Sequence, residues 1–307
     1  MLDGLMLGWL TACVLQLENL ADLVAEHRDC LKASVQSFAL GGQTIGGETP
    51  GLMGVVNLSA DSWYRESVCL TTEAAIERGN ILDAQGAALV DVGGESSLLD
   101  AARVEAIDQQ SILLPVVEGL VGRSVAVSVE TYHASVAEAC LERGAAVINL
   151  TGAGEAPAIF DAVARHEAGV IICFVQGSNV REVQDLQLDA DPVPMLLDYF
   201  GSQIEQARAA GVEKIFIDPG LGFYYRNLQD SAVRVRHQMN VFLNSFRLRQ
   251  LGWPVCHALP HAFDFFREEV RSAEPFFAVM AALGRTSLFR THEVARTRAV
   301  LETLGVY

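Results

Sequence analysis

Short apolar runs alternate with longer helical patterns along the chain from about residue 50 onward. Eight runs have the length of strands, and we expect one strand over each of Leu52–Asn57, Ala88–Val92, Val125–Glu130, Ala146–Leu150, Val170–Phe174, Lys214–Asp218, Pro254–Ala258 and Ser287–Thr291. Apolar residues at three- and four-residue spacing predict helices between them, among these Thr72–Gln85, Ala102–Gly119, His133–Glu142 and Met195–Ala209. Helical patterns end at Gly86, Gly144 and Gly211, as left-handed C-caps would require.

Eight strands that alternate with helices over roughly 250 residues predict a (β/α)₈ barrel. The structural alternative is a doubly wound open sheet, which usually carries GxGxxG after its first strand. The segment Asn57–Asp61 contains no glycine. We therefore expect an α/β protein with the TIM-barrel fold.

The first 35 residues precede the barrel as a helical extension, and residues 36–307 form the barrel. The run Leu5–Val24 is apolar, but polar residues interrupt it before it reaches about 18 residues, so we expect an amphipathic helix and no membrane span. A signal peptide usually begins with basic residues, but Met1–Leu7 contains Asp3 and no basic residue, which argues against one. A hairpin is expected around Gly41–Gly47.

Composition narrows the class of protein. The 307 residues hold 22 Lys and Arg against 38 Asp and Glu, a net charge of −16, and half of them are hydrophobic. This apolar content excludes a disordered chain, and the acidic balance argues against broad nucleic-acid binding. Six scattered cysteines without a CxxC pair predict reduced core thiols rather than a metal cluster. We expect a cytoplasmic protein.

Chemistry in a (β/α)₈ barrel occurs at the carboxyl ends of the strands, and polar residues gather there in this chain. Glu130, Asn149 and Asp218 end three different strands, where carboxylates and an amide are able to bind one small polar heterocycle. Arg290 and His292 stand two residues apart at the last strand and face the same way, so both can hold one anion. Asn57, from the neighbouring first strand, completes this anion or metal site.

These strand ends resemble the pterin-binding family typified by dihydropteroate synthase. Six ordered motifs carry the resemblance: Met53–Trp63 resembles MGxxNxTPDSF, Asp91–Ser97 resembles DxGGEST, Ser128–Thr131 resembles the third-strand IDT, Val147–Asn149 resembles IND, Asp218–Phe223 resembles DPGxGF, and Arg290–Glu293 resembles RxHD. The match runs from about residue 36 to the C-terminus.

The resemblance implies a barrel that binds a hydroxymethyl-dihydropterin pyrophosphate and transfers the pterin to p-aminobenzoate in folate biosynthesis. It places the pterin at Glu130, Asn149 and Asp218, with Gln176, Phe223 and His261 around it. It assigns the pyrophosphate and Mg²⁺ to Asn57, Arg290 and His292, with Asn57 as the metal ligand. The loops that hold the second substrate contain Asp61, Ser62 and Ser97.

The chain departs from the family pattern at several of these positions. Glu130 replaces the family's aspartate, and His261 lies where the family has a lysine on strand 7. The loop sequences that follow the first two strands also differ: Ala60 replaces a proline, and Ser97–Asp100 replaces TRPG. These two loops shape the p-aminobenzoate pocket in the family, so the amine substrate stays open.

Three functions therefore remain. The first is a divergent dihydropteroate synthase-like transferase, which accepts p-aminobenzoate or another amine. The second is a non-catalytic pterin-binding or assembly protein on the same fold. The third is a methyl-tetrahydrofolate methyltransferase, a reaction that gives no reason for Arg290 and His292. A homodimer through the apolar stretch Pro275–Phe277 is expected by analogy with the family.

Overall fold

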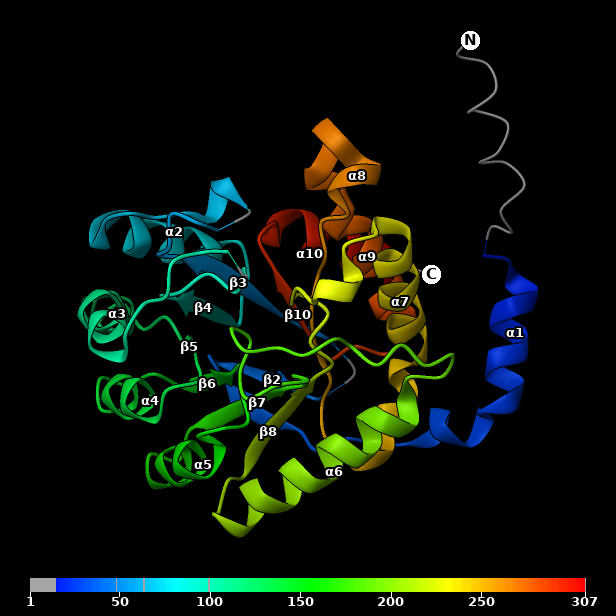
Figure 1. The fold of residues 1–307 in the computed structure, drawn as a ribbon, viewed down its shortest axis with the longest axis horizontal. Coiled ribbons are helices and arrows are strands. Elements are labelled where there is room, and N and C mark those ends of the chain that lie inside the picture. The colour runs from blue at the N-terminus through cyan, green and yellow to red at the C-terminus, as the bar shows by residue number, and fades with distance from the viewer. Residues whose placement is uncertain (1–14, 48, 63, 99, 307) are drawn as a thin grey trace.

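Eight parallel strands form one nearly closed sheet in the computed structural model, which describes residues 15–306 except 48, 63 and 99 (Figure 1). The hydrogen-bonded order is β8-β7-β6-β5-β4-β3-β10-β9, and a parallel bridge between Ile217 and Val255 joins the two edges. The strands are β3 (Gly51–Asn57), β4 (Leu89–Gly93), β5 (Val127–Thr131), β6 (Val147–Leu150), β7 (Gly169–Cys173), β8 (Lys214–Asp218), β9 (Cys256–Ala258) and β10 (Leu288–Thr291). The predicted TIM barrel and its eight strands are confirmed.

Helices surround this sheet on its outer side (Figure 1). They are α2 (Thr72–Ala84), α3 (Ala106–Val121), α4 (Ala134–Leu141), α5 (Ala156–Arg165), α6 (Val193–Ala209), α7 (Ser231–Asn244), α8 (Phe263–Phe266), α9 (Ala273–Leu283) and α10 (Val294–Leu304). Short 3₁₀ turns accompany them at Arg28–Lys32, Arg65–Ser67, Arg226–Leu228, Ser245–Leu251 and Arg267–Ser272. Gly86, Gly144 and Gly211 have positive φ after their helices, as predicted.

The predicted start of one helix is wrong. The periodic pattern suggested a helix from Ala102, but α3 begins at Ala106. Loop hydrogen bonds explain the difference, because the Ala102 N–H donates to Asp61 and the Val104 N–H donates to Glu95. Side-chain acceptors therefore hold residues 102–104 in the loop instead of the first helical turn.

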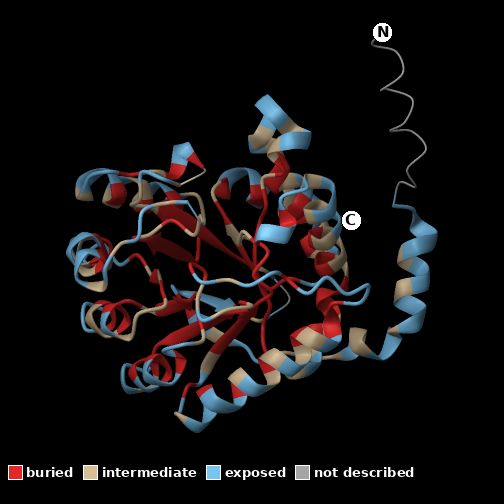
Figure 2. Ribbon diagram, in the orientation of Figure 1, coloured by how far each residue is buried: buried red, intermediate tan, exposed pale blue. Residues whose placement is uncertain are grey.

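Two apolar clusters hold the barrel together (Figure 2). The larger one fills the space between the sheet and the helices. The smaller one lies inside the barrel, where Met53, Ile171 and Phe216 meet Leu40 and Ile45 from a hairpin. This hairpin, β1 (Phe38–Leu40) with β2 (Gln43–Ile45), closes the amino-terminal end of the barrel, so polar groups have room only at the opposite end.

The chain before this hairpin lies on the outside of the barrel, where the Leu31 carbonyl accepts from Arg285 and the Gln36 N–H donates to Gly252. Helix α1 (Leu17–Glu26) carries no buried residue and stands beside the barrel (Figure 1). The first part of the predicted amphipathic helix, before residue 15, lies outside the described residues. No helix among those described is long and apolar enough to cross a membrane. In the stretch expected to form a dimer, Phe276 is exposed and Phe277 is buried, and the dimer stays a prediction.

The hairpin turn offers a test of how tightly it closes the barrel. Gly41 and Gly42 both have positive φ, but a Cβ at Gly41 would lie 2.1 Å from the Ala88 carbonyl oxygen, whereas nothing lies within 4 Å of a Cβ at Gly42. We expect Gly41→Ala to lower the free energy of unfolding by about 2–4 kcal/mol and Gly42→Ala by about 1–2 kcal/mol. Denaturant unfolding measures both; equal losses would show that the turn does not press against the barrel.

Candidate functional site

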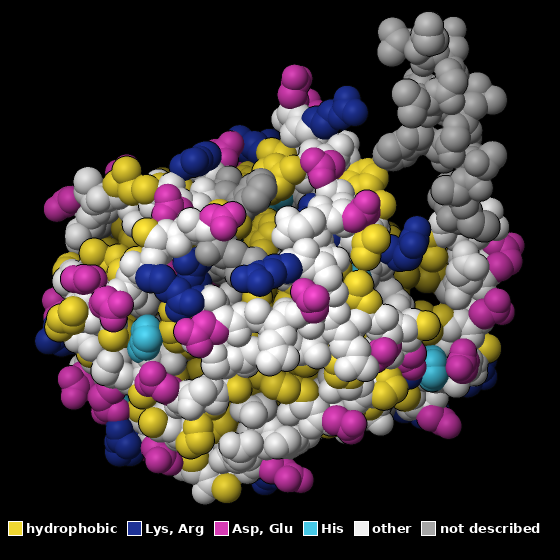
Figure 3. All heavy atoms as spheres, in the orientation of Figure 1, with side chains coloured by type: hydrophobic (Ala, Val, Ile, Leu, Met, Phe, Trp, Pro, Cys, Tyr) yellow, Lys and Arg dark blue, Asp and Glu magenta, His cyan; other side chains and the backbone are white. Residues whose placement is uncertain are grey.

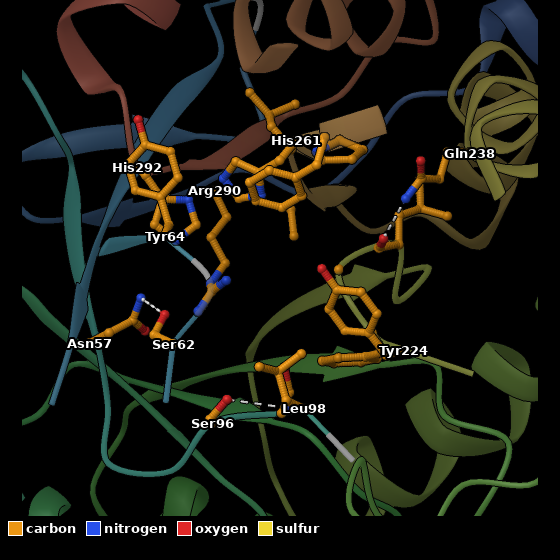
Figure 4. A pocket seen from close by; sticks show the side chains of 18 of the residues that line it. Asn57, Ser62, Tyr64, Ser96, Leu98, Tyr224, Gln238, His261, Arg290 and His292 are labelled. Atoms are coloured by element: carbon orange, nitrogen blue, oxygen red, sulfur yellow. Dashed lines mark hydrogen bonds between the residues drawn. The ribbon is translucent and has the colours of Figure 1, made fainter. Parts of the chain in front are cut away.

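A cavity of about 100 Å³ opens at the carboxyl ends of the strands. Its wall comes from loops that are far apart in the sequence, and Figure 4 shows Asn57, Tyr64, Tyr224, His261, Arg290 and His292 around it. The face that carries the loop between β7 and α6 has basic side chains near its centre, with acidic side chains beside them and over the rest of the face (Figure 3). The basic side chains attract an anion locally, although the overall charge is strongly negative.

Arg290 forms the floor of this cavity. Its Nε donates to Asp91 at 2.7 Å, and its terminal nitrogen donates to Glu130 at 2.6 Å. Asp91 is fully buried and also accepts from Ser128 at 2.6 Å and from Asn149 at 3.1 Å. The guanidinium thus bridges two acidic strand ends, and we call this arrangement the Arg290 bridge.

More negative than positive charge is buried around this bridge. Burial raises the pKa of Glu130 from 4.5 to about 7, although Arg290 opposes the shift. Burial likewise raises the pKa of Asp218 from 3.8 to about 6. Burial alone would lower the pKa of Arg290, but Asp91 and Glu130 raise it above its ordinary value. One permanent cation therefore faces carboxylates that bind protons near neutral pH.

A tight turn positions Asp218. Its backbone ends β8, and one carboxylate oxygen accepts from the Gly220 N–H at 2.7 Å. Gly220 has a φ of 75°, and a Cβ there would lie 2.3 Å from the Phe174 carbonyl oxygen. Only glycine fits this turn without strain, which explains the Asp-Pro-Gly sequence at the strand end.

Asn57 turns its amide oxygen toward the cavity. The Ser67 hydroxyl donates to the Tyr64 carbonyl, so it must accept from Asn57 Nδ2, which lies 2.7 Å away. Nδ2 also donates to Ser62 at 2.8 Å. Both amide hydrogens are thereby used, and Oδ1 remains beside the open space above Gly93. A hard cation such as Mg²⁺ prefers such an oxygen ligand together with phosphate oxygens, so the residues present fit that ion.

Three rings form one wall of the cavity (Figure 4). The rings of Tyr64, His261 and His292 all contact one another: the Tyr64 centroid is 4.8 Å from His261 and 4.6 Å from His292, and the two histidine centroids are 4.9 Å apart. The His292 Nδ1 is 2.7 Å from Glu274, a carboxylate that only accepts, so Nδ1 carries the proton. Burial lowers the pKa of His292 to about 4, which leaves the ring neutral at pH 7.

The loop after β4 is fastened by buried polar contacts. Glu95 accepts from the Tyr132 hydroxyl at 2.7 Å and lies 3.6 Å from the Arg181 guanidinium. Arg181 also donates to the carbonyls of Ser96 and Ala101. The described part of this loop is therefore held in place by residues from the loops after β5 and β7.

The structure separates the residues proposed from the sequence into three groups. Those that line the cavity are Asn57, Ser62, Ser97, Glu130, Phe223, His261, Arg290 and His292. Asn149 and Asp218 are buried near the Arg290 bridge and are absent from the cavity wall. Asp61 and Gln176 face loops instead, because Asp61 accepts from Ala102 and Gln176 accepts from Gln187.

Sequence reasoning missed three residues that organise the site: Asp91, Tyr64 and Glu274. Asp91 was within a quoted motif, but nothing in that motif showed that it would bond Arg290. Glu274 occupies the first turn of α9, where an acidic residue is usual at a helix N-terminus. Tyr64 lies in a loop, and no periodicity marks its packing against two histidines.

Known proteins share both the sequence pattern and the fold. Residues 53–258 match the family model described as pterin binding enzyme. A dihydropteroate synthase of Staphylococcus haemolyticus is 34% identical over 188 residues, which cover 60% of this chain and 67% of that protein. An "inactive dihydropteroate synthase 2" of Mycobacterium tuberculosis is 30% identical over 280 residues, 86% of this chain and 85% of that protein.

Solved structures agree with this result. The dihydropteroate synthase of Xanthomonas albilineans with 4-aminobenzoic acid superimposes with a TM-score of 0.73 at 28% identity, and the match covers 89% of this chain and 98% of that one. The same enzyme in complex with 7,8-dihydropteroate gives a TM-score of 0.69 at 27% identity, covering 88% and 98%. On its motifs, its barrel and these relatives, the chain belongs to the pterin-binding enzyme family.

Proposed function

We propose that this chain binds a hydroxymethyl-dihydropterin pyrophosphate and transfers the pterin to an aromatic amine such as p-aminobenzoate. The observation that carries the proposal is the Arg290 bridge, which places the Arg290 cation and the Glu130 carboxylate in the wall of one cavity, with the Asp91 carboxylate buried behind them. A pterin pyrophosphate has the opposite pattern: a strongly anionic tail and a heterocycle rich in N–H donors.

Binding would exchange the partners of the Arg290 bridge. The pyrophosphate takes over the Arg290 guanidinium, and the pterin N–H groups take over the carboxylates that Arg290 releases. This movement also opens the way to Asn149 and Asp218, which are buried beside the bridge. Each group that loses its internal partner gains one from the ligand, so the exchange leaves no buried charge unpaired.

The proposed reaction separates charge at this site. The C–O bond to the pyrophosphate breaks with its electron pair on the leaving group, a C–N bond forms to the amine, and the amine nitrogen loses a proton. Arg290 stabilises the departing anion, and Glu130 with Asp218 stabilises the positive charge that develops on the pterin. Mg²⁺, held at the Asn57 Oδ1, would supply further neutralisation of the pyrophosphate charge.

A second candidate function is pterin binding without transfer. A relative that aligns with 86% of this chain carries the name inactive dihydropteroate synthase 2. His261, which stacks on Tyr64 beside Glu274, stands where the family's lysine is expected. A methyl-tetrahydrofolate methyltransferase fits less well, because that reaction has no pyrophosphate for Arg290.

The deciding experiment is a calorimetric titration with hydroxymethyl-dihydropterin pyrophosphate and Mg²⁺, followed by addition of p-aminobenzoate and an assay for released pyrophosphate. Binding with pyrophosphate release supports the transferase. Binding without release of pyrophosphate, with p-aminobenzoate and with other aromatic amines, supports the non-catalytic function. No binding overturns both.

Asp218→Asn should weaken pterin binding by about 30- to 150-fold, because the variant loses a charge-assisted acceptor worth about 2–3 kcal/mol. Calorimetry on the folded variant measures this loss. Asp191→Asn is the matched control, since Asp191 pairs with Arg247 on the surface. An unchanged affinity of Asp218→Asn would place the pterin elsewhere.

Pterin affinity should rise between pH 5 and pH 8. Asp218, with a pKa of about 6, and Glu130, with a pKa of about 7, are mostly protonated at pH 5 and then offer weaker acceptors. The need to ionise Asp218 alone weakens binding about tenfold at pH 5. Calorimetry across this range measures how the affinity changes with pH. Glu130→Gln should weaken that pH dependence near pH 7, where Glu130 titrates. An affinity that falls with rising pH would exclude carboxylate acceptors.

Arg290→Met should destabilise the fold by about 3–5 kcal/mol at pH 8, because it leaves buried carboxylates without their cation. The stability lost by Arg290→Met should be smaller at pH 5 than at pH 8. Glu130 binds its proton more tightly in the folded chain than in the unfolded one, so its protonation stabilises the fold at low pH, and this gain disappears as the pH rises through about 7.

Thermal melts from pH 5 to pH 8 test this dependence. Arg143→Met is the control, because Arg143 pairs with Glu118 on an exposed helix surface and should change stability little at any pH. The Arg290 bridge would lose its assigned role if Arg290→Met melted like the parent protein at pH 8.

A further inference from the structure

A second group of side chains, beside the Arg290 bridge, has the composition of a metal site. His261 follows β9, Glu274 is the second residue of α9, and His292 directly follows β10. One ligand atom from each lies within 4.8 Å of the other two. Neither the pterin nor the pyrophosphate explains why a buried glutamate faces two histidines here.

The Glu274 carboxylate is aimed by its surroundings. Its Oε2 accepts from the Thr291 hydroxyl and from the backbone N–H groups of His292 and Glu293, at 3.0 Å and 3.2 Å. These contacts fix the group at the start of α10 and turn Oε1 toward the two rings. Oε1 lies 2.7 Å from His292 Nδ1 and 3.1 Å from His261 Nε2. Such hydrogen bonds to a ligating carboxylate are typical of metal sites.

His261 Nε2 is the atom that internal contacts leave unsatisfied. It is buried and has no hydrogen-bond partner among the described residues, although Oε1 is only 3.1 Å away. A buried polar atom without a partner is unfavourable, because it has lost its hydrogen bonds to water. The Tyr64 ring packs against both histidine rings, stacked on His261 and tilted against His292. An ion between Nε2 and Oε1 would give His261 Nε2 the partner that it lacks.

We propose that His261, Glu274 and His292 bind one divalent transition-metal ion of the Zn²⁺ class. Two imidazoles and one carboxylate favour such a borderline ion over Mg²⁺, which prefers oxygen ligands and suits Asn57. Ligands at about 2.0–2.2 Å from one tetrahedral ion are about 3.3–3.6 Å apart. The separations of 3.1 Å and 2.7 Å here are shorter, so the three side chains would move slightly apart when the ion binds. The ion would join the loop after β9, α9 and the end of β10.

The ion would also reverse the hydrogen-bonding character of His292. The Nδ1 proton now points at Glu274, so a neutral ring has only a lone pair on Nε2. A metal ion on Nδ1 displaces that proton and leaves the neutral ring with an Nε2–H, a donor suited to a phosphate oxygen. This consequence for pyrophosphate rests on the proposed function; the metal site itself does not.

The test uses Co²⁺ as a spectroscopic probe of the chelator-treated, full-length protein, with no pterin present. We expect one Co²⁺ per chain with visible absorption bands typical of nitrogen and oxygen ligands, and displacement of Co²⁺ by Zn²⁺. His261→Phe keeps an aromatic ring on Tyr64 and removes one ligand, so it should weaken Co²⁺ binding by about 100-fold or more. Zn²⁺ should also raise the melting temperature of the parent protein and not of this variant.

His133→Phe is the matched control, because the His133 ring packs at a tilt against Tyr132, its Nδ1 lies 3.6 Å from a Glu155 carboxylate oxygen, and it does not line the cavity. It should bind Co²⁺ like the parent. The proposal is overturned if the folded parent binds no stoichiometric Co²⁺, or if His261→Phe binds it unchanged. Because no pterin is present, a failure here is distinguishable from a failure of the proposed function, which calorimetry with the pterin pyrophosphate tests.

Discussion

The contact of Arg290 with Asp91 and Glu130 is the interaction on which the organisation of this site depends. Three acidic side chains, Asp91, Glu130 and Asp218, lie on three strands around one buried space, and Arg290 is the cation placed among them. Without it the barrel mouth would hold like charges in a medium of low polarity. Arg290 therefore offsets part of this negative charge, and a ligand must offer both signs of charge to replace the contacts that Arg290 makes with Asp91 and Glu130.

The barrel directs these charges to one end by filling the other. The hairpin β1–β2 places Leu40 and Ile45 among the interior residues of the strands. Apolar side chains therefore fill the amino-terminal end of the barrel interior. Parallel strands in register then bring Glu130 opposite Asn149, and Gly93 opposite both Asn57 and Glu130. The glycine leaves the space between these polar residues open.

Sequence patterns predicted the strands well because buried parallel strands are short apolar runs, and the ends of these runs located Glu130, Asn149, Asp218 and Arg290. Contacts between loops were not predictable in the same way. The late start of α3 depends on Asp61 and Glu95, and the packing of Tyr64 depends on two histidines that follow it by about 200 residues or more. Such contacts leave no periodic signal, because each joins single residues rather than faces of elements.

The fastened loop after β4 has a thermodynamic consequence for any second ligand that contacts it. Its described residues are held without any ligand. Glu95 accepts from the Tyr132 hydroxyl and lies beside Arg181, and Arg181 donates to the carbonyls of Ser96 and Ala101. The conformational entropy of ordering these residues is thus lost when the chain folds and not when a ligand arrives. A ligand that contacts the described part of this loop therefore binds a surface that is already ordered. The heat-capacity change of binding there depends on the apolar area that the ligand buries, and folding of these loop residues adds nothing to it.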